Sequence, residues 1–193
     1  MSTAHIYGDP PSIICDETSH IGYGLAPYVG QAWETALKKA LPTSVKPVIF
    51  RTSFVIGNSG GAFKKLKILT RFGLGGTIGH GNQGFSWLHI DDMDALFIQA
   101  IEDDNMTGVY VASAPNPVSN RIFMKTLRRC LKIPFGLPAT NWMIKFVCTY
   151  ILKTDPDIVL YGRYVKSARL EQEGFTFKFP TLELAIKNLL SKP

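Results

Sequence analysis

Apolar positions recur along the chain at two spacings, one typical of helices and one typical of buried strands. The helical spacing predicts helices over residues 26–41, 62–72, 91–102, 120–131 and 139–153, and a last helix begun by Thr181. β-Branched and aromatic segments predict strands over residues 45–56, 85–90, 109–113 and 175–179, with the end of another strand within residues 2–9. Strands that alternate with helices are typical of an α/β layer architecture.

Two of these predicted helices have further features, an apolar side in one and an acidic amino terminus in the other. In the helix over residues 26–41, one side consists of small and apolar residues, namely Ala32, Trp33, Ala36, Leu37 and Ala40. The helix over residues 91–102 directly follows the strand over residues 85–90. Asp91 or Asp92 is expected to cap its amino terminus, because a carboxylate there accepts free backbone N–H groups.

The composition is that of a folded globular protein. The 193 residues are 46% hydrophobic and 19% charged, and this length favours one domain, or one domain with an appendage. The most apolar stretch, residues 142–152, contains Lys145 and Thr149 and is too short for a membrane span. The start lacks a signal-peptide pattern, and the three cysteines form no CxxC pair. The sequence therefore predicts a cytoplasmic protein with no membrane partner.

The charge is mildly basic. Lys and Arg number 21 against 15 Asp and Glu, which gives a net charge of +6 and can favour anionic ligands such as nucleotides. The basic residues of segments 64–71 and 121–132 alternate with apolar residues at helical spacing, as on a solvated amphipathic face. No nucleic-acid partner is expected. The four histidines form no HxH or HExxH pattern, so no metal site is expected either.

A phosphate-binding loop, which an α/β nucleotide-binding domain needs, is not evident. The sequence contains neither a GxGxxG motif nor a Walker A motif. The glycine-rich residues 73–81 have the wrong spacing, and a loop lining a site or a hairpin turn fits them better. The chain also opens on what reads as the end of a buried strand, which is unusual for a self-contained domain.

Several stretches, taken in order, carry a family resemblance. They are residues 2–9 (STAHIYGD), 31–34 (QAWE), 51–57 (RTSFVIG) with 60–62 (GGA), 72–92 ending in SWLHIDD, and 174–183, which begin GF and end FPTLE. With these motifs the chain resembles the carboxy-terminal portion of an atypical extended short-chain dehydrogenase/reductase. The subgroup is the epimerase family, whose sugar-nucleotide epimerase-like members have a small C-terminal domain of unknown function.

The resemblance implies a partial Rossmann-like fold. It would be a doubly wound parallel sheet that lacks its amino-terminal half. Residues 1–135 would belong to the NAD(P)-binding domain, and residues 136–193 would form a small α+β domain over the substrate cleft. NADP(H) would bind at the carboxyl ends of the strands. The family's glycine-rich pyrophosphate loop lies in the missing half, so this chain alone is expected to bind the cofactor weakly.

The resemblance also suggests catalytic residues. Hydride transfer in this superfamily normally uses a Tyr-x-x-x-Lys pair, whose lysine lowers the pKa of the tyrosine. None of the seven tyrosines has a lysine four residues later. Thr3 takes the place of the family's catalytic Ser/Thr, or it is a strand-end hydroxyl bonded to nearby backbone. His89 is a candidate proton relay, or a structural histidine bonded to backbone or a carboxylate.

Binding residues follow from the same comparison. Arg51, Ser53 and Val55 would pass under the nicotinamide ribose, although Arg51 equally suits an ion pair and Val55 equally suits the core. Gln83 and Trp87 would line the substrate cleft.

Three functions stay open. The first is an NADP(H)-binding epimerase-like protein acting on a nucleotide sugar or a similar small carbinol or carbonyl substrate. The second is a non-catalytic NADP(H) sensor or interaction scaffold, which the absent Tyr-x-x-x-Lys pair favours, and the third is an inactive fragment. Because the sheet would have an uncovered apolar flank, a homodimer is a further possibility.

Overall fold

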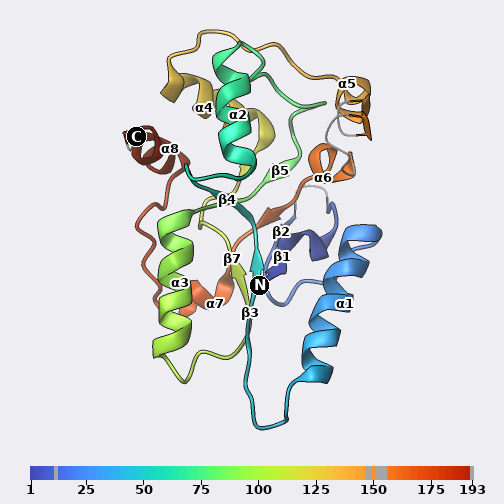
Figure 1. Cartoon of the computed structure of the whole chain (residues 1–193), viewed down its shortest axis with the longest axis vertical. Helices are drawn as coiled ribbons and strands as arrows, with labels where there is room; N and C mark the ends of the chain where they lie inside the picture. The colour runs from blue at the N-terminus through green and yellow to red at the C-terminus, as the bar shows by residue number, and fades with distance from the viewer. Residues whose placement is uncertain (11–12, 147–148, 151–155, 192–193) are drawn as a thin grey trace.

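The computed structural model describes residues 1–10, 13–146, 149–150 and 156–191 (Figure 1). The strands are β1 (Ser2–Thr3), β2 (Ile14–Cys15), β3 (Val48–Thr52), β4 (Phe54–Ile56), β5 (Gly84–Phe85), β6 (Trp87–His89), β7 (Gly108–Ala112), β8 (Val118–Ser119) and β9 (Tyr164–Val165). The helices are η1 (Ala4–Tyr7, 3-10), α1 (Leu25–Ala40), α2 (Gly61–Arg71), α3 (Ile90–Glu102), α4 (Asn120–Leu131), α5 (Asn141–Phe146), α6 (Asp157–Leu160), α7 (Ala168–Gln172) and α8 (Leu182–Ser191).

A parallel three-stranded sheet in the order β1-β3-β7 forms the centre of the molecule. β3 pairs with β1 on one side, with Thr3 opposite Thr52, and with β7 on the other, with Thr52 opposite Ala112. The residues of β3 are largely buried, as a strand covered on both faces requires. The first residues of the chain and the segment beginning at Val48 are therefore neighbouring parallel strands.

The single strand expected over residues 45–56 is divided at Ser53. Its first part, β3, belongs to the central sheet, whereas β4 pairs in parallel with β6. Ser53 lies at the division, and both its backbone N–H and its Oγ donate to the carbonyl oxygen of Ala112. The backbone N–H and side chain of Ser53 thus stay bonded to β7 where the chain moves from one pair of strands to the next.

The helices stand on different sides of the sheet (Figure 1). α1 forms one flank and packs on η1 and β1, while α3 lies on the opposite side next to β4 and β6. α4 packs against both α2 and α8 beyond the end of β4. A buried cluster there includes Phe63 of α2, Phe123 of α4 and Ile186 of α8, so the last helix shares a hydrophobic core with elements from the middle of the chain.

The predicted helices are confirmed as α1, α2, α3, α4 and α8, with small shifts in their first and last residues. The exception is the helix predicted over residues 139–153. There the structure has α5 from Asn141 to Phe146, and part of the expected range lies outside the described residues.

The strand predicted over residues 175–179 is wrong. Phe175 and Phe177 contact each other edge to face at 4.8 Å between ring centroids. The backbone N–H groups of Lys178 and Phe179 donate to the carboxylate of Asp92, at 2.7 and 3.2 Å. The segment therefore needs no neighbouring strand at these two residues, because the Asp92 side chain accepts their backbone N–H groups.

Candidate functional site

The carboxyl ends of three parallel strands bring hydroxyl groups to one edge of the central sheet. Thr3 ends β1 opposite Thr52 of β3, which in turn lies opposite Ala112 of β7. Ser53 and Ser113 are the residues that directly follow β3 and β7. In open α/β sheets, ligands bind outside this edge. Thr3, Ser53 and Ser113 therefore define the candidate site.

A buried ion pair joins α1 to β3 beside this edge. The guanidinium of Arg51 donates from Nε and Nη2 to the two carboxylate oxygens of Glu34, both at 2.9 Å. Its Nη1 donates to the hydroxyl of Tyr7 at 3.0 Å, and Ser2 Oγ donates to Glu34 at 2.8 Å. Each nitrogen of the Arg51 side chain thus has a partner, which is the ion-pair role considered for this residue. A contact with cofactor stays a prediction.

The network fixes the protonation of its members. Burial lowers the pKa of Arg51, but the hydrogen bonds to Glu34 and Tyr7 outweigh it and raise the pKa above its usual range. Burial opposes ionisation of Glu34 as well, yet the bonds from Arg51 and Ser2 hold its pKa below the ordinary value. Burial raises the pKa of Tyr7 to about 12. Tyr7 therefore keeps its proton near neutral pH and is a poor acid-base catalyst there.

Thr3 and His5 lie together where β1 continues into η1. Thr3 Oγ1 accepts the backbone N–H of His5 at 3.1 Å and caps the 3-10 helix. This is the backbone-bonded alternative considered for Thr3, whose side chain is only half-buried. Burial and the positive charge of Arg163 lower the pKa of His5 from 6.5 to about 4. His5 is consequently neutral at physiological pH, beside the proposed catalytic hydroxyl.

His89 is fully buried at the junction of β6 and α3. Its Nδ1 accepts the backbone N–H of Asp91 at 3.0 Å, and its ring lies 3.9 Å from that of Phe179. His89 itself caps α3, so the expectation that Asp91 or Asp92 does so is wrong. Asp92 binds the 178–179 backbone instead, and burial raises its pKa. This geometry is that of the structural histidine; a proton-relay role stays a prediction.

The other candidate binding residues differ in their access to a ligand. Trp87 is fully buried in the core, and its Nε1 donates to Asn116 O at 3.3 Å. Gln83 is 7% exposed and donates from Nε2 to Ile78 O at 3.0 Å. Ser53 and Val55 are half-buried at and beyond the end of β3. The structure places Ser53 at the edge with Thr3, whereas Gln83 directly precedes β5 and Trp87 begins β6.

Sequence reasoning missed Arg163, the most unusual charge near this edge. Its side chain is 8% exposed, donates from Nη2 to Tyr161 O at 3.0 Å, and has no partner for Nε among the described residues. Burial lowers its pKa to about 10, against the attraction of Asp9. The backbone at Arg163 lies directly against that of β5. This is possible because Gly84 and Gly162 approach each other more closely than a Cβ on either residue would allow. In the sequence, the signal that could have pointed to Arg163 is a Gly-Arg pair directly before a short strand.

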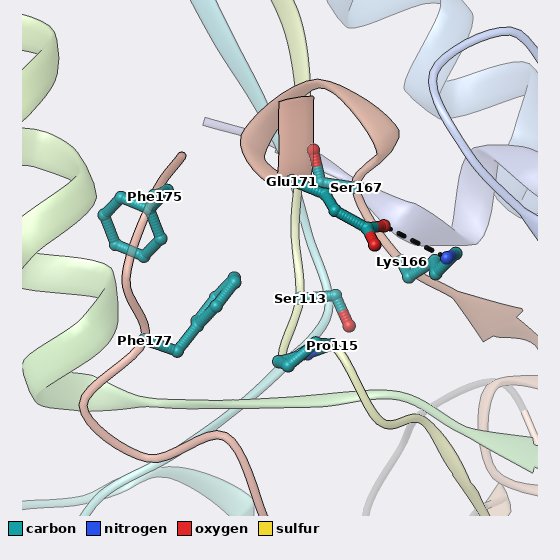
Figure 2. Close-up of a pocket in the computed structure, with 7 residues that line it drawn as sticks. All are labelled: Ser113, Pro115, Lys166, Ser167, Glu171, Phe175 and Phe177. Atoms are coloured by element: carbon teal, nitrogen blue, oxygen red, sulfur yellow. Dashed lines mark hydrogen bonds and ion pairs between the residues drawn. The ribbon is translucent and has the colours of Figure 1, made fainter. Parts of the chain in front are cut away.

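A cavity of about 220 Å³ opens beyond the end of β7 (Figure 2). Figure 2 shows Phe175 and Phe177 on one side of it and the ion pair of Lys166 with Glu171, at 3.1 Å, across from them. Ser113 lies between, and its Oγ donates to Val165 O at 3.1 Å. This cavity combines aromatic rings with a surface ion pair, and none of its lining residues was a candidate from the sequence.

The described residues contain no group of three His, Cys, Asp or Glu side chains able to hold a metal ion. In the same part of the chain, no helix has the length and apolar character needed to cross a membrane.

Comparison with known proteins places this geometry in a family. Residues 140–189 match the model of a domain of unknown function, DUF1731. An Arabidopsis thaliana protein, "epimerase family protein SDR39U1 homolog, chloroplastic", is 31% identical over 185 residues, which is 95% of this chain and 52% of that protein. An epimerase family protein of Staphylococcus aureus is 28% identical over 160 residues, with 83% and 52% covered.

Two solved structures show the same arrangement. The human epimerase family protein SDR39U1 with NADPH superposes with a TM-score of 0.90 at 27% identity, covering 100% of this chain and 64% of that one. A nucleoside-diphosphate sugar epimerase from Corynebacterium glutamicum superposes with a TM-score of 0.78 at 28% identity, covering 98% and 36%.

The fold and the edge of hydroxyl groups define part of a Rossmann-like α/β protein of the extended short-chain dehydrogenase/reductase type. Within that class, the chain is similar to epimerase family proteins, as its motifs suggested, and its residues 140–189 match the DUF1731 model. It spans about half the length of the curated relatives that it matches.

Proposed function

We propose that this chain forms the nicotinamide and substrate side of an NADP(H)-dependent epimerase-like domain. The glycine-rich grip on the pyrophosphate would come from polypeptide that this chain does not span. The substrate class would be a nucleotide sugar or a similar small molecule with a carbinol or carbonyl carbon.

One observation supports this proposal above the others. The entire chain superposes on the human structure that was solved with NADPH, and yet accounts for only 64% of it. The carboxyl edge of β1, β3 and β7 is therefore aligned with a protein that holds this cofactor. The Corynebacterium relative, a nucleoside-diphosphate sugar epimerase by name, supports the substrate class.

The residues at the edge suit the ribose and carboxamide end of NADP(H). Thr3 and Ser53 offer half-buried hydroxyls, and neither is part of the Arg51 ion pair. When bound, the cofactor would supply or accept a hydride. Thr3 would orient a substrate oxygen, and neutral His5 beside it would add a hydrogen-bonding group without a positive charge.

Titration with NADPH tests the proposal, with the change in melting temperature and in nicotinamide fluorescence as readouts. We expect weak binding, and we expect Ser53→Ala and Thr3→Ala each to weaken it about 3- to 10-fold, the effect of losing one or two neutral hydrogen bonds. Thr43→Ala, at an exposed position before β3, is the control. No response to NADPH, or equal binding by all three variants, would contradict the proposal.

A second candidate, a non-catalytic NADP(H) sensor, is favoured by one observation. Tyr7, in η1 directly after β1, is buried, bonded to Arg51 and held protonated by a pKa of about 12. NADPH binding without turnover of nucleotide sugars, by this chain completed with the segment it does not span, would favour the sensor. Turnover would favour the enzyme.

A further inference from the structure

Arg163 has far fewer partners than Arg51, although both arginines are buried to the same degree. Arg163 is 8% exposed and Arg51 is 7% exposed. Each nitrogen of the Arg51 side chain is bonded, and Glu34 balances its charge. The guanidinium of Arg163 makes one hydrogen bond among the described residues, from Nη2 to Tyr161 O, and its Nε is buried without an acceptor. Most of its donors are therefore unused by the fold.

The titratable groups around Arg163 do not neutralise it. His5 is uncharged at neutral pH, with a pKa of about 4, because of burial and of the charge of Arg163. Burial also raises the pKa of the Cys15 thiol, which keeps its proton. Asp9 attracts Arg163 from an exposed position, but its Oδ1 accepts the backbone N–H of Gly162 at 3.2 Å. Since a buried charge without a counter-charge is costly, a purely structural role does not account for this arginine.

The backbone holds Arg163 beside the candidate site. Arg163 directly precedes β9, which pairs in parallel with β2. Its carbonyl oxygen accepts a hydrogen bond from Ser86 Oγ at 2.9 Å, which ties this segment to the residue between β5 and β6. The charge of Arg163 acts on His5, whose backbone N–H donates to Thr3 Oγ1 at 3.1 Å. The guanidinium therefore lies near the edge where Thr3 would orient a substrate oxygen.

These features fit an oxyanion as the ligand. A guanidinium presents planar, parallel N–H donors that match two oxygens of a carboxylate or a phosphate. Nε is the one nitrogen of the Arg163 side chain that is both buried and unbonded among the described residues, so Nη1 is open to an incoming group. His5 and Cys15 carry no negative charge that would repel an anion. A bound anion would supply the missing counter-charge.

We propose that Arg163 binds an anionic oxygen group of the substrate, a carboxylate or a phosphate, beside Thr3 and His5. The substrate would then carry negative charge close to the carbon that reacts, as in a sugar acid or a sugar phosphate. This proposal deepens the proposed function and rests on it for the place of the substrate, whereas the anion site itself is tested without NADPH.

The probes for this site are D-glucuronate, inorganic phosphate and D-glucose, which is the uncharged match of glucuronate. All are added to the chain at constant ionic strength. NMR of isotope-labelled arginine side chains follows the Nε–H group of Arg163, whose signal is assigned by its loss in Arg163→Lys. We expect glucuronate or phosphate to shift this signal and glucose to leave it unchanged. The anion that binds more tightly identifies the substrate group as a carboxylate or a phosphate.

The variant Arg163→Met removes the charge and nearly keeps the length of the side chain. It should weaken binding of the anion at least about 10-fold, the effect of losing one charged hydrogen bond. Arg71→Met, at the exposed arginine that ends α2, is the matched control and should leave binding unchanged. Without ligand, Arg163→Met should raise the melting temperature by about 2–4 °C, because it removes a buried charge that has no counter-charge.

The titration of His5 reports on the same site. A bound anion balances the charge of Arg163, which is one cause of the low pKa of His5, so this pKa should rise above about 4 in the complex. The ring signals of His5 in an NMR pH titration measure this change. The exposed His20 should titrate equally with and without the anion.

The proposal is overturned if neither anion shifts the Nε–H signal of Arg163. It is also overturned if Arg163→Met binds the anion as tightly as the parent protein, or melts at a lower temperature than the parent. The NMR measurement uses the parent protein and so tests the site whatever the variant does. Anion binding at Arg163 without any response to NADPH would support this site and contradict the proposed function, so the two failures are distinct.

Discussion

At the residue scale, the candidate site is unusual in how its titratable groups are held. His5 is kept neutral by burial and by the charge of Arg163, while Tyr7 is kept protonated by burial. Both groups are therefore uncharged near neutral pH, at an edge where the proposed ligand carries a polar nicotinamide end.

This neutrality predicts a specific loss of stability in acid. The pKa of His5 is about 4 in the folded protein and 6.5 ordinarily, so between these values the unfolded chain binds more protons. The free energy of unfolding should therefore fall as the pH decreases from 6.5 towards 4. His5→Gln should make this fall shallower in urea titrations at a series of pH values. His20→Gln, at an exposed histidine, should leave it unchanged; equal slopes in the parent and His5→Gln would contradict the prediction.

At the scale of elements, the Arg51–Glu34 pair holds α1 against β1 and β3. Removing one member of a buried ion pair leaves the other charge without compensation, at a cost of about 3–5 kcal/mol. Glu34→Gln should therefore lower the free energy of unfolding by about 3 kcal/mol, measured by urea denaturation. Glu102→Gln, on the exposed end of α3, is the matched control. A change in Glu34→Gln no greater than that in the control would contradict the role assigned to the pair.

Sequence patterns were most informative about the helices and strands. The helices at α2, α3, α4 and α8 follow from apolar spacing because the apolar side of each packs inward, whereas the apolar side that predicted α1 is exposed in this structure. The division at Ser53 was not visible, because β3 and β4 have the same β-branched and aromatic character and differ only in their partners. The strand expected over residues 175–179 failed because Asp92, far away in sequence, binds that backbone.

Individual site residues were harder to assign. The family resemblance pointed to Thr3, Arg51 and Ser53, and the structure brings them near one another because the parallel strands β1 and β3 end at a common edge. It could not show that Arg51 turns towards Glu34, or that His89 caps α3 in place of the acidic residues after it. Arg163 was missed because its burial depends on the close approach of Gly84 and Gly162, which no local pattern records.

At the scale of the whole molecule, the chain has one well-packed end and one open flank. α2, α4 and α8 share a closed hydrophobic core, whereas α1 and the free edge of β1 face outward. The chain spans about half the length of the curated relatives that it matches. Under the proposed function, this chain would contact the nicotinamide end of the ligand, and polypeptide that it does not span would contact the adenosine end.

Binding of the two halves of the cofactor, measured separately, tests this account most directly. Reduced nicotinamide mononucleotide and adenosine 2′,5′-bisphosphate carry the two ends of NADPH, and calorimetry or ligand-observed NMR can compare them on the isolated chain. The account predicts binding of the nicotinamide half, weakened by Ser53→Ala, and none of the adenosine half. Preference for the adenosine half, or binding of neither, would contradict it.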